Sequence, residues 1–170
     1  MHLTDREWWT LVHGMILGAL FLLAFSGGLA GLYSLRLDLL TPEGLRERVR
    51  RLKIGMSVMA ITAWLTVITG TWIVYPWYRE TSPDSPKSRL LADPDTADWH
   101  KFGMEWKEHI AWIAPLLATT AAFLAIYYGS AMARNRYIRL VVMAFFVGAF
   151  VTAAIAGLYG ALITKVAPVQ

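Results

Sequence analysis

The sequence predicts an all-α fold, an integral membrane four-helix bundle. Hydrophobic residues make up 56% of the 170 residues and charged residues only 16%, with a mean hydropathy of +0.46. Soluble domains carry about 25% charged residues. The apolar residues are also gathered into four blocks. Each block approaches the roughly 20 residues that a helix needs to cross about 30 Å of hydrocarbon.

Helices rather than strands are expected in these blocks, because none of them alternates between apolar and polar residues and lipid cannot hydrogen-bond an open backbone. We therefore expect a single transmembrane domain over residues 1–170. Its membrane-spanning helices are expected at about 8–33, 54–75, 106–128 and 138–164. The largest loop is expected over 76–105.

The loop charges predict an orientation. Nine of the sixteen lysines and arginines fall in the first and third loops: Arg36, Arg46, Arg48, Arg50, Arg51, Lys53, Arg134, Arg136 and Arg139. Because cytoplasmic loops carry an excess of positive charge, these two loops are expected in the cytoplasm and both termini outside. The expected location is a plasma membrane of the bacterial type.

The two halves of the chain share short patterns that suggest two related helical hairpins. Glu7-Trp8 precedes His13 in the first helix, and Glu105-Trp106 precedes His109 in the third. Parallel repeats of this kind occur in membrane proteins. The alternative is chance similarity between apolar helices, which use a small set of residues.

Two histidines, His13 and His109, are expected inside the membrane at similar depth near the outer surface. An ionisable residue in a membrane helix is costly and by default indicates a functional site. Neutral imidazole suits both axial positions of a haem iron, and a helical bundle can hold the ring between two such ligands. The other two histidines, His2 and His100, are expected at the surface.

Small and acidic residues near these histidines extend the hypothesis. Gly14, Gly18 and Gly157 would leave space for a cofactor ring, although small residues more commonly permit close helix packing. Glu105 and Glu108 are candidate proton acceptors. Covalent c-type haem and thiolate-bound iron–sulfur clusters are excluded because the chain has no cysteine.

Other readings of the histidines remain open. They would be purely structural in a cofactor-free subunit that supports the assembly of a larger membrane complex. Alternatively, Glu105 and His109, which share a helix face, would join His13 and His100 in a non-haem metal site. The few polar groups at the helix centres argue against ion-coupled transport.

With paired histidines on four membrane helices, the chain resembles small four-helix membrane cytochrome b subunits, the quinone-linked anchors of respiratory complexes. The resemblance implies one b-type haem held by His13 and His109, and electron transfer between a quinone pool and an outer-facing redox partner. It implies a non-catalytic subunit rather than a stand-alone enzyme. The expected partners are the lipid bilayer, other membrane or outer-facing redox subunits and a quinone, but no nucleic acid. The chain departs from diheme members, which carry further histidines toward the inner side.

Overall fold

The structure, a computed structural model, describes residues 2–168 and is predominantly helical, with no strand among the described residues. Four helices are long and apolar enough to cross a membrane. They are Asp5–Tyr33, Pro42–Tyr78, Trp99–Tyr128 and Arg136–Val166. The predicted all-α bundle of four helices is confirmed.

Three of the four long helices change their winding along their length. The first consists of α1 (Asp5–Leu11), the π-helical η1 (Val12–Ile16) and α2 (Leu17–Tyr33). The second consists of α3 (Pro42–Thr69), the π-helical η3 (Gly70–Val74) and α4 (Tyr75–Tyr78). The third consists of the π-helical η4 (Trp99–Met104), α6 (Glu105–Ile110) and α7 (Ile113–Tyr128), and the fourth is α9 (Arg136–Val166). The connections contain the 3₁₀ turn η2 (Leu37–Leu39), α5 (Pro86–Ala92) and α8 (Ala131–Arg134).

Local sequence explains where the helices begin and end. The Thr41 side chain accepts a hydrogen bond from the backbone N–H of Gly44, and Pro42 occupies the first turn of α3. Asn135 caps α9 in the same way. The third helix ends at Gly129, whose φ of +49° is disfavoured for residues that carry a side chain.

The helices extend beyond the apolar blocks. The second begins at Pro42 rather than at residue 54, because the basic segment before the apolar block carries its own cap and continues the same helix. The long connection is correspondingly shorter than 76–105 and covers residues 79–98. Hydropathy marks only the part of a helix that is apolar, whereas the cap marks where the helix starts.

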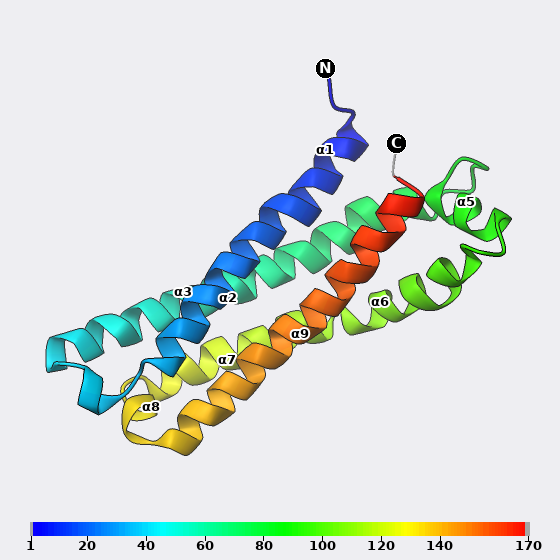
Figure 1. The fold of residues 1–170 in the computed structure, drawn as a ribbon. Coiled ribbons are helices and arrows are strands. Elements are labelled where there is room, and N and C mark those ends of the chain that lie inside the picture. Colours follow the sequence, from blue (N-terminus) through cyan, green and yellow to red (C-terminus); the bar gives the residue numbers. More distant parts are fainter. Residues whose placement is uncertain (1, 169–170) are drawn as a thin grey trace.

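The helices run alternately up and down, so both ends of the chain lie at one end of the bundle (Figure 1). We call this the terminal end, which also holds residues 79–98. The opposite end, with residues 34–41 and 129–135, is the loop end. Neighbours in sequence pack side by side along the bundle, and α2 also contacts α9.

The main core lies between the helices toward the loop end. Two glycines of α2 allow close packing there. A methyl group at Gly28 would lie 2.9 Å from Cε1 of Phe146, and one at Gly31 would lie 2.8 Å from Cδ2 of Leu52. Phe146 is fully buried and stacks on Phe25, with ring centroids 5.3 Å apart.

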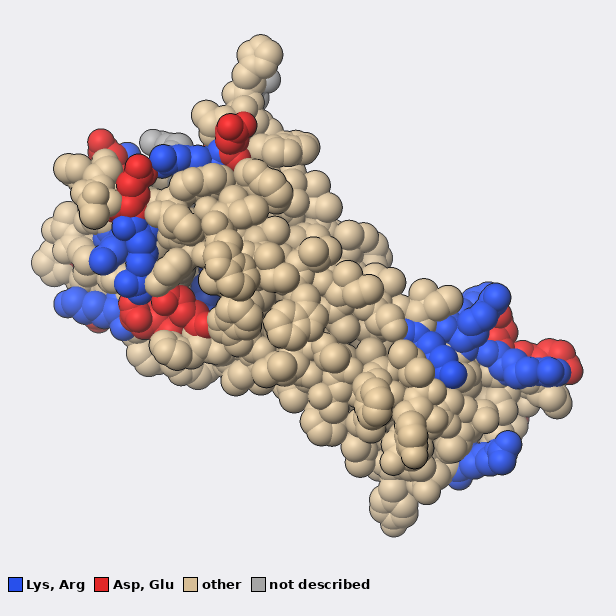
Figure 2. All heavy atoms as spheres, turned by 180° about the vertical axis from the view of Figure 1, so that it is seen from behind, with Lys and Arg blue, Asp and Glu red and all other residues tan. Residues whose placement is uncertain are grey.

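The surface separates into charged ends and an uncharged middle. Figure 2 shows lysines, arginines and carboxylates at the two ends, with a broad band free of charged groups between them on the face shown. Large apolar side chains such as Leu23 and Phe123 are exposed in this band. An apolar band flanked by charged ends fits a lipid bilayer, so this is an integral membrane protein in contact with lipid.

Candidate functional site

The three π-helical segments all lie at the terminal end, and each contains or adjoins a polar contact. η1 contains His13, η3 begins at Gly70, and η4 contains His100. A π turn inserts an extra residue, which alters the direction of side chains and is frequent at functional sites. Apolar periodicity gave no sign of these segments in the sequence. The terminal end is also where the sequence predicts the functional histidines.

His13 is held by the second helix. Its Nδ1 lies 3.0 Å from Oγ1 of Thr69, and that hydroxyl donates its own proton to the carbonyl oxygen of Leu65 over 2.7 Å. In the tautomer that donates from Nδ1, the Thr69 hydroxyl accepts this bond while it donates to Leu65. In that tautomer Nε2 of His13 carries a lone pair that can bind a metal ion or accept a hydrogen bond.

Gly70 makes room for the His13 ring. A methyl group at this position would lie 2.7 Å from Cε1 and 3.4 Å from Nε2 of His13. Because Gly70 has no side chain, the imidazole ring can pack directly against the second helix. No pattern in the sequence predicts this contact.

Lys107 crosses from α6 to α9 at the same end. Its Nζ lies 3.2 Å from the position that a methyl group at Gly160 would occupy. The side chain is half-buried and forms no ion pair with any residue that the structure describes. The ammonium group is near enough to His13 to act on it electrostatically.

A cluster around Arg79 joins the second and third helices. Arg79 donates to Glu105 over 2.5 Å and to Glu108 over 3.1 Å, and the Tyr75 hydroxyl donates to Glu108 over 2.8 Å. Burial disfavours the charged form of Arg79, but the hydrogen bond to Glu108 and the nearby carboxylates outweigh this and raise the pKa of Arg79. The two predicted proton acceptors, Glu105 and Glu108, are therefore brought together by one guanidinium group.

His100 is buried, with 7% of its surface exposed, so the expectation that it is a surface residue was wrong. Its Nδ1 lies 2.9 Å from the hydroxyl of Tyr78, which is also buried, and its Nε2 lies 4.0 Å from Glu105. The segment from 86 to 104 folds back against α9 through Leu90, Met104 and Ile163. This packing could not be predicted from hydropathy, because the segment is polar in sequence. His2 is exposed, as expected.

His109 lies in different surroundings from His13. Its side chain is exposed, and its Nδ1 lies 2.7 Å from the backbone carbonyl of Glu105. Because a carbonyl only accepts, Nδ1 of His109 carries the proton and Nε2 is free. Lys107, two residues earlier, points toward α9, and residues two apart lie on nearly opposite faces of a helix. No hydrogen bond or common partner joins the two predicted ligands.

The glycines predicted to leave space do not serve helix packing. A methyl group at Gly14, Gly18 or Gly157 would meet no atom within 4 Å. These positions are open in the single chain, in contrast to Gly28, Gly31 and Gly70.

The donors present suit haem iron better at His13 than at His109. His13 has a fixed ring, a free Nε2 and a seat at Gly70 that a Cβ would fill. His109 has the same donor chemistry on an exposed face. Among residues 2–168, no group of three or more histidine, cysteine or acidic side chains lies close enough to hold a metal ion.

No family model, no curated protein and no solved structure matches this chain.

Proposed function

We propose that the chain is a membrane subunit of an electron-transfer complex and binds one b-type haem at the terminal end, with His13 and His109 as its candidate axial ligands. The observation that carries the proposal is the hydrogen-bond chain from His13 through Thr69 to Leu65, which engages Nδ1 of His13 and so supports a tautomer with its lone pair on Nε2. Histidines that bind metals commonly donate their other ring N–H in this way. His109 meets the same chemical requirement through the Glu105 carbonyl.

When bound, the haem would supply one-electron transfer between a quinone pool and a redox partner at the terminal end. The chain's own residues would hold and orient it. The Lys107 ammonium is a suitable partner for a propionate, since it has no carboxylate partner among the described residues. Glu105 and Glu108 would accept the protons that a quinol releases, with Arg79 holding both carboxylates in place.

The haem is tested by the pyridine haemochrome spectrum of the protein purified from native membranes. We expect one b-type haem per chain in the wild type and in His2→Ala, and its loss in His13→Ala and His109→Ala. A wild-type protein with no b-haem band would overturn the proposal. A His109→Ala protein that keeps a low-spin bis-imidazole spectrum would remove His109 as a ligand.

We also propose that the loop end faces the cytoplasm of a bacterial-type plasma membrane and that both termini face outward. The loop end carries nine lysines and arginines against three carboxylates, Asp38, Glu43 and Glu47. Because the chain has no cysteine, Asp95→Cys and Leu37→Cys each create a single labelling site. An impermeant thiol reagent applied to intact cells should label the first and not the second, and the reverse pattern would contradict this orientation.

A cofactor-free structural subunit is the second candidate. It is favoured by the contact of His13 with Thr69 and Gly70, which joins the first two helices without any further group. It predicts that the chain co-purifies with other membrane subunits and has a featureless visible spectrum.

A further inference from the structure

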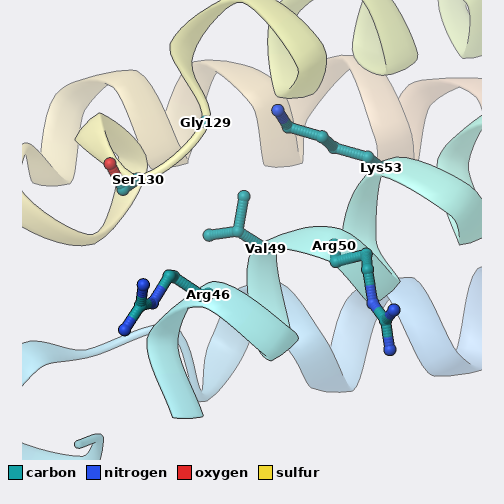
Figure 3. A pocket seen from close by; sticks show the side chains of 6 residues that line it. All are labelled: Arg46, Val49, Arg50, Lys53, Gly129 and Ser130. Carbon is teal, nitrogen blue, oxygen red and sulfur yellow. The ribbon is translucent and has the colours of Figure 1, made fainter. Parts of the chain in front are cut away.

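A shallow hollow of about 350 Å³ lies at the loop end, between the start of α3 and the turn that joins α7 to α8. Figure 3 shows that Lys53 and Val49 point from α3 toward this turn, that the Arg46 guanidinium extends to one side, and that the Arg50 guanidinium points away from the turn. Gly129 and Ser130 of the turn complete the lining.

The hollow has an excess of positive charge. Arg46 pairs with Glu43 over 3.2 Å, and Arg50 pairs with Glu47 over 2.7 Å. Lys53 forms no ion pair with a described residue, and its Nζ lies 3.7 Å from the position that a side chain at Gly129 would take. The lack of a side chain at Gly129 thus lets the ammonium group approach the backbone of the turn.

The hollow lies at the depth of lipid headgroups. Lys53 directly precedes the exposed Ile54, where the apolar part of the second helix begins. The turn directly follows Tyr127 and Tyr128, and Tyr127 is 72% exposed. Tyrosines favour the boundary between hydrocarbon and headgroups. An acyl chain could therefore follow the apolar surface while its headgroup occupied the hollow.

We propose that this hollow binds the phosphate of an anionic phospholipid. Lys53 and Arg46 provide the charge, the Ser130 hydroxyl and the turn provide hydrogen bonds, and Val49 contacts the glycerol part of the headgroup. Basic pockets between membrane helices bind anionic headgroups in this way. The site is independent of the haem proposal, because it lies at the opposite end of the bundle and shares no residue with it.

The test is native mass spectrometry of the detergent-purified chain titrated with phosphatidylglycerol or phosphatidylcholine. We expect preferential binding of phosphatidylglycerol, reduced about thirtyfold in Arg46→Gln/Lys53→Gln, since each cation near the surface contributes about 1 kcal/mol. The single variant Lys53→Gln should reduce binding about fivefold, and it tests the proposal if the double variant does not fold.

The matched control is Arg134→Gln/Arg136→Gln. These two arginines lie at the same end, are exposed, and form no ion pair within the described part of the chain. The control should change binding less than about twofold, because it removes the same charge from outside the hollow. An equal loss in both double variants would overturn the proposal, as would equal binding of the two lipids. Displacement of the lipid by millimolar inorganic phosphate would also overturn it, because it would indicate a site for free phosphate.

Discussion

Nδ1 of His13 lies 3.0 Å from the Thr69 hydroxyl, and this hydrogen bond ties the first transmembrane helix to the second. The same hydroxyl donates to the carbonyl oxygen of Leu65, so the bond from Nδ1 of His13 to Thr69 completes a chain that ends on the backbone of the second helix. The contact has consequences for stability whether or not a cofactor binds at Nε2.

Replacing Thr69 by valine tests this hydrogen bond. The change keeps the shape of the side chain but leaves the His13 N–H without an acceptor, and we expect the free energy of unfolding to fall by about 1–3 kcal/mol. Haem affinity should fall about tenfold or more if His13 is a ligand. Unfolding in mixed detergent micelles and the haemochrome spectrum measure the two effects. Thr69→Ser should restore both, and a stable Thr69→Val protein with wild-type haem content would contradict the assigned role.

Replacing Gly70 by alanine tests the seat of the His13 ring. The new methyl group would lie 2.7 Å from Cε1 of a ring that Thr69 holds in place. We expect a loss of about 1–3 kcal/mol, as for overpacking elsewhere. Gly55→Ala is the control, because a methyl group there meets nothing within 4 Å. Helix propensity predicts that Gly55→Ala stabilises the protein by up to about 1 kcal/mol. Equal changes in the free energy of unfolding of the two variants would show that the His13 ring is not tightly packed against Gly70.

Two adjacent glycines in α2 should respond in opposite ways to substitution. Gly28→Ala would press on Phe146, which is fully buried and cannot easily move because it stacks on Phe25. We expect a loss of about 1–3 kcal/mol in thermal or detergent-induced unfolding. Gly27→Ala meets no atom within 4 Å and should be neutral or slightly stabilising. A destabilised Gly27→Ala protein would mean that a partner chain covers this face.

The Arg79 cluster should contribute more to the free energy of unfolding than an exposed ion pair at the same end. Arg79→Gln removes the donor shared by Glu105 and Glu108, and we expect a loss of about 1–2 kcal/mol, since hydrogen bonds to charged groups contribute more than neutral ones. Arg6→Gln breaks the exposed pair with Glu80 and the contact of the guanidinium with the Trp77 ring, and it should cost less than about 1 kcal/mol. Thermal unfolding of both variants in the same detergent makes the comparison. Similar losses would show that solvent screens the Arg79 cluster fully.

The terminal end could be found from the sequence, but its contacts could not. His13, His109, Glu105 and Glu108 were identified as ionisable residues near one boundary, because the cost of burying such groups is independent of the fold. Which of them meet depends on the rotation of each helix about its axis. The π turns in η1 and η3 alter that rotation. The pattern of apolar residues in the sequence does not predict these turns.

The number of spans, their up-and-down order and the uneven distribution of charge were determined by the sequence alone, since hydropathy and charge act on each segment separately. The tertiary structure decided the partners of individual side chains. It placed His13 on Thr69 and Gly70, left His109 exposed, and buried His100 against Tyr78. The reason is physical, because a membrane requires each span to be an apolar helix, whereas the rotation and close approach of the helices depend on packing between residues far apart in the chain.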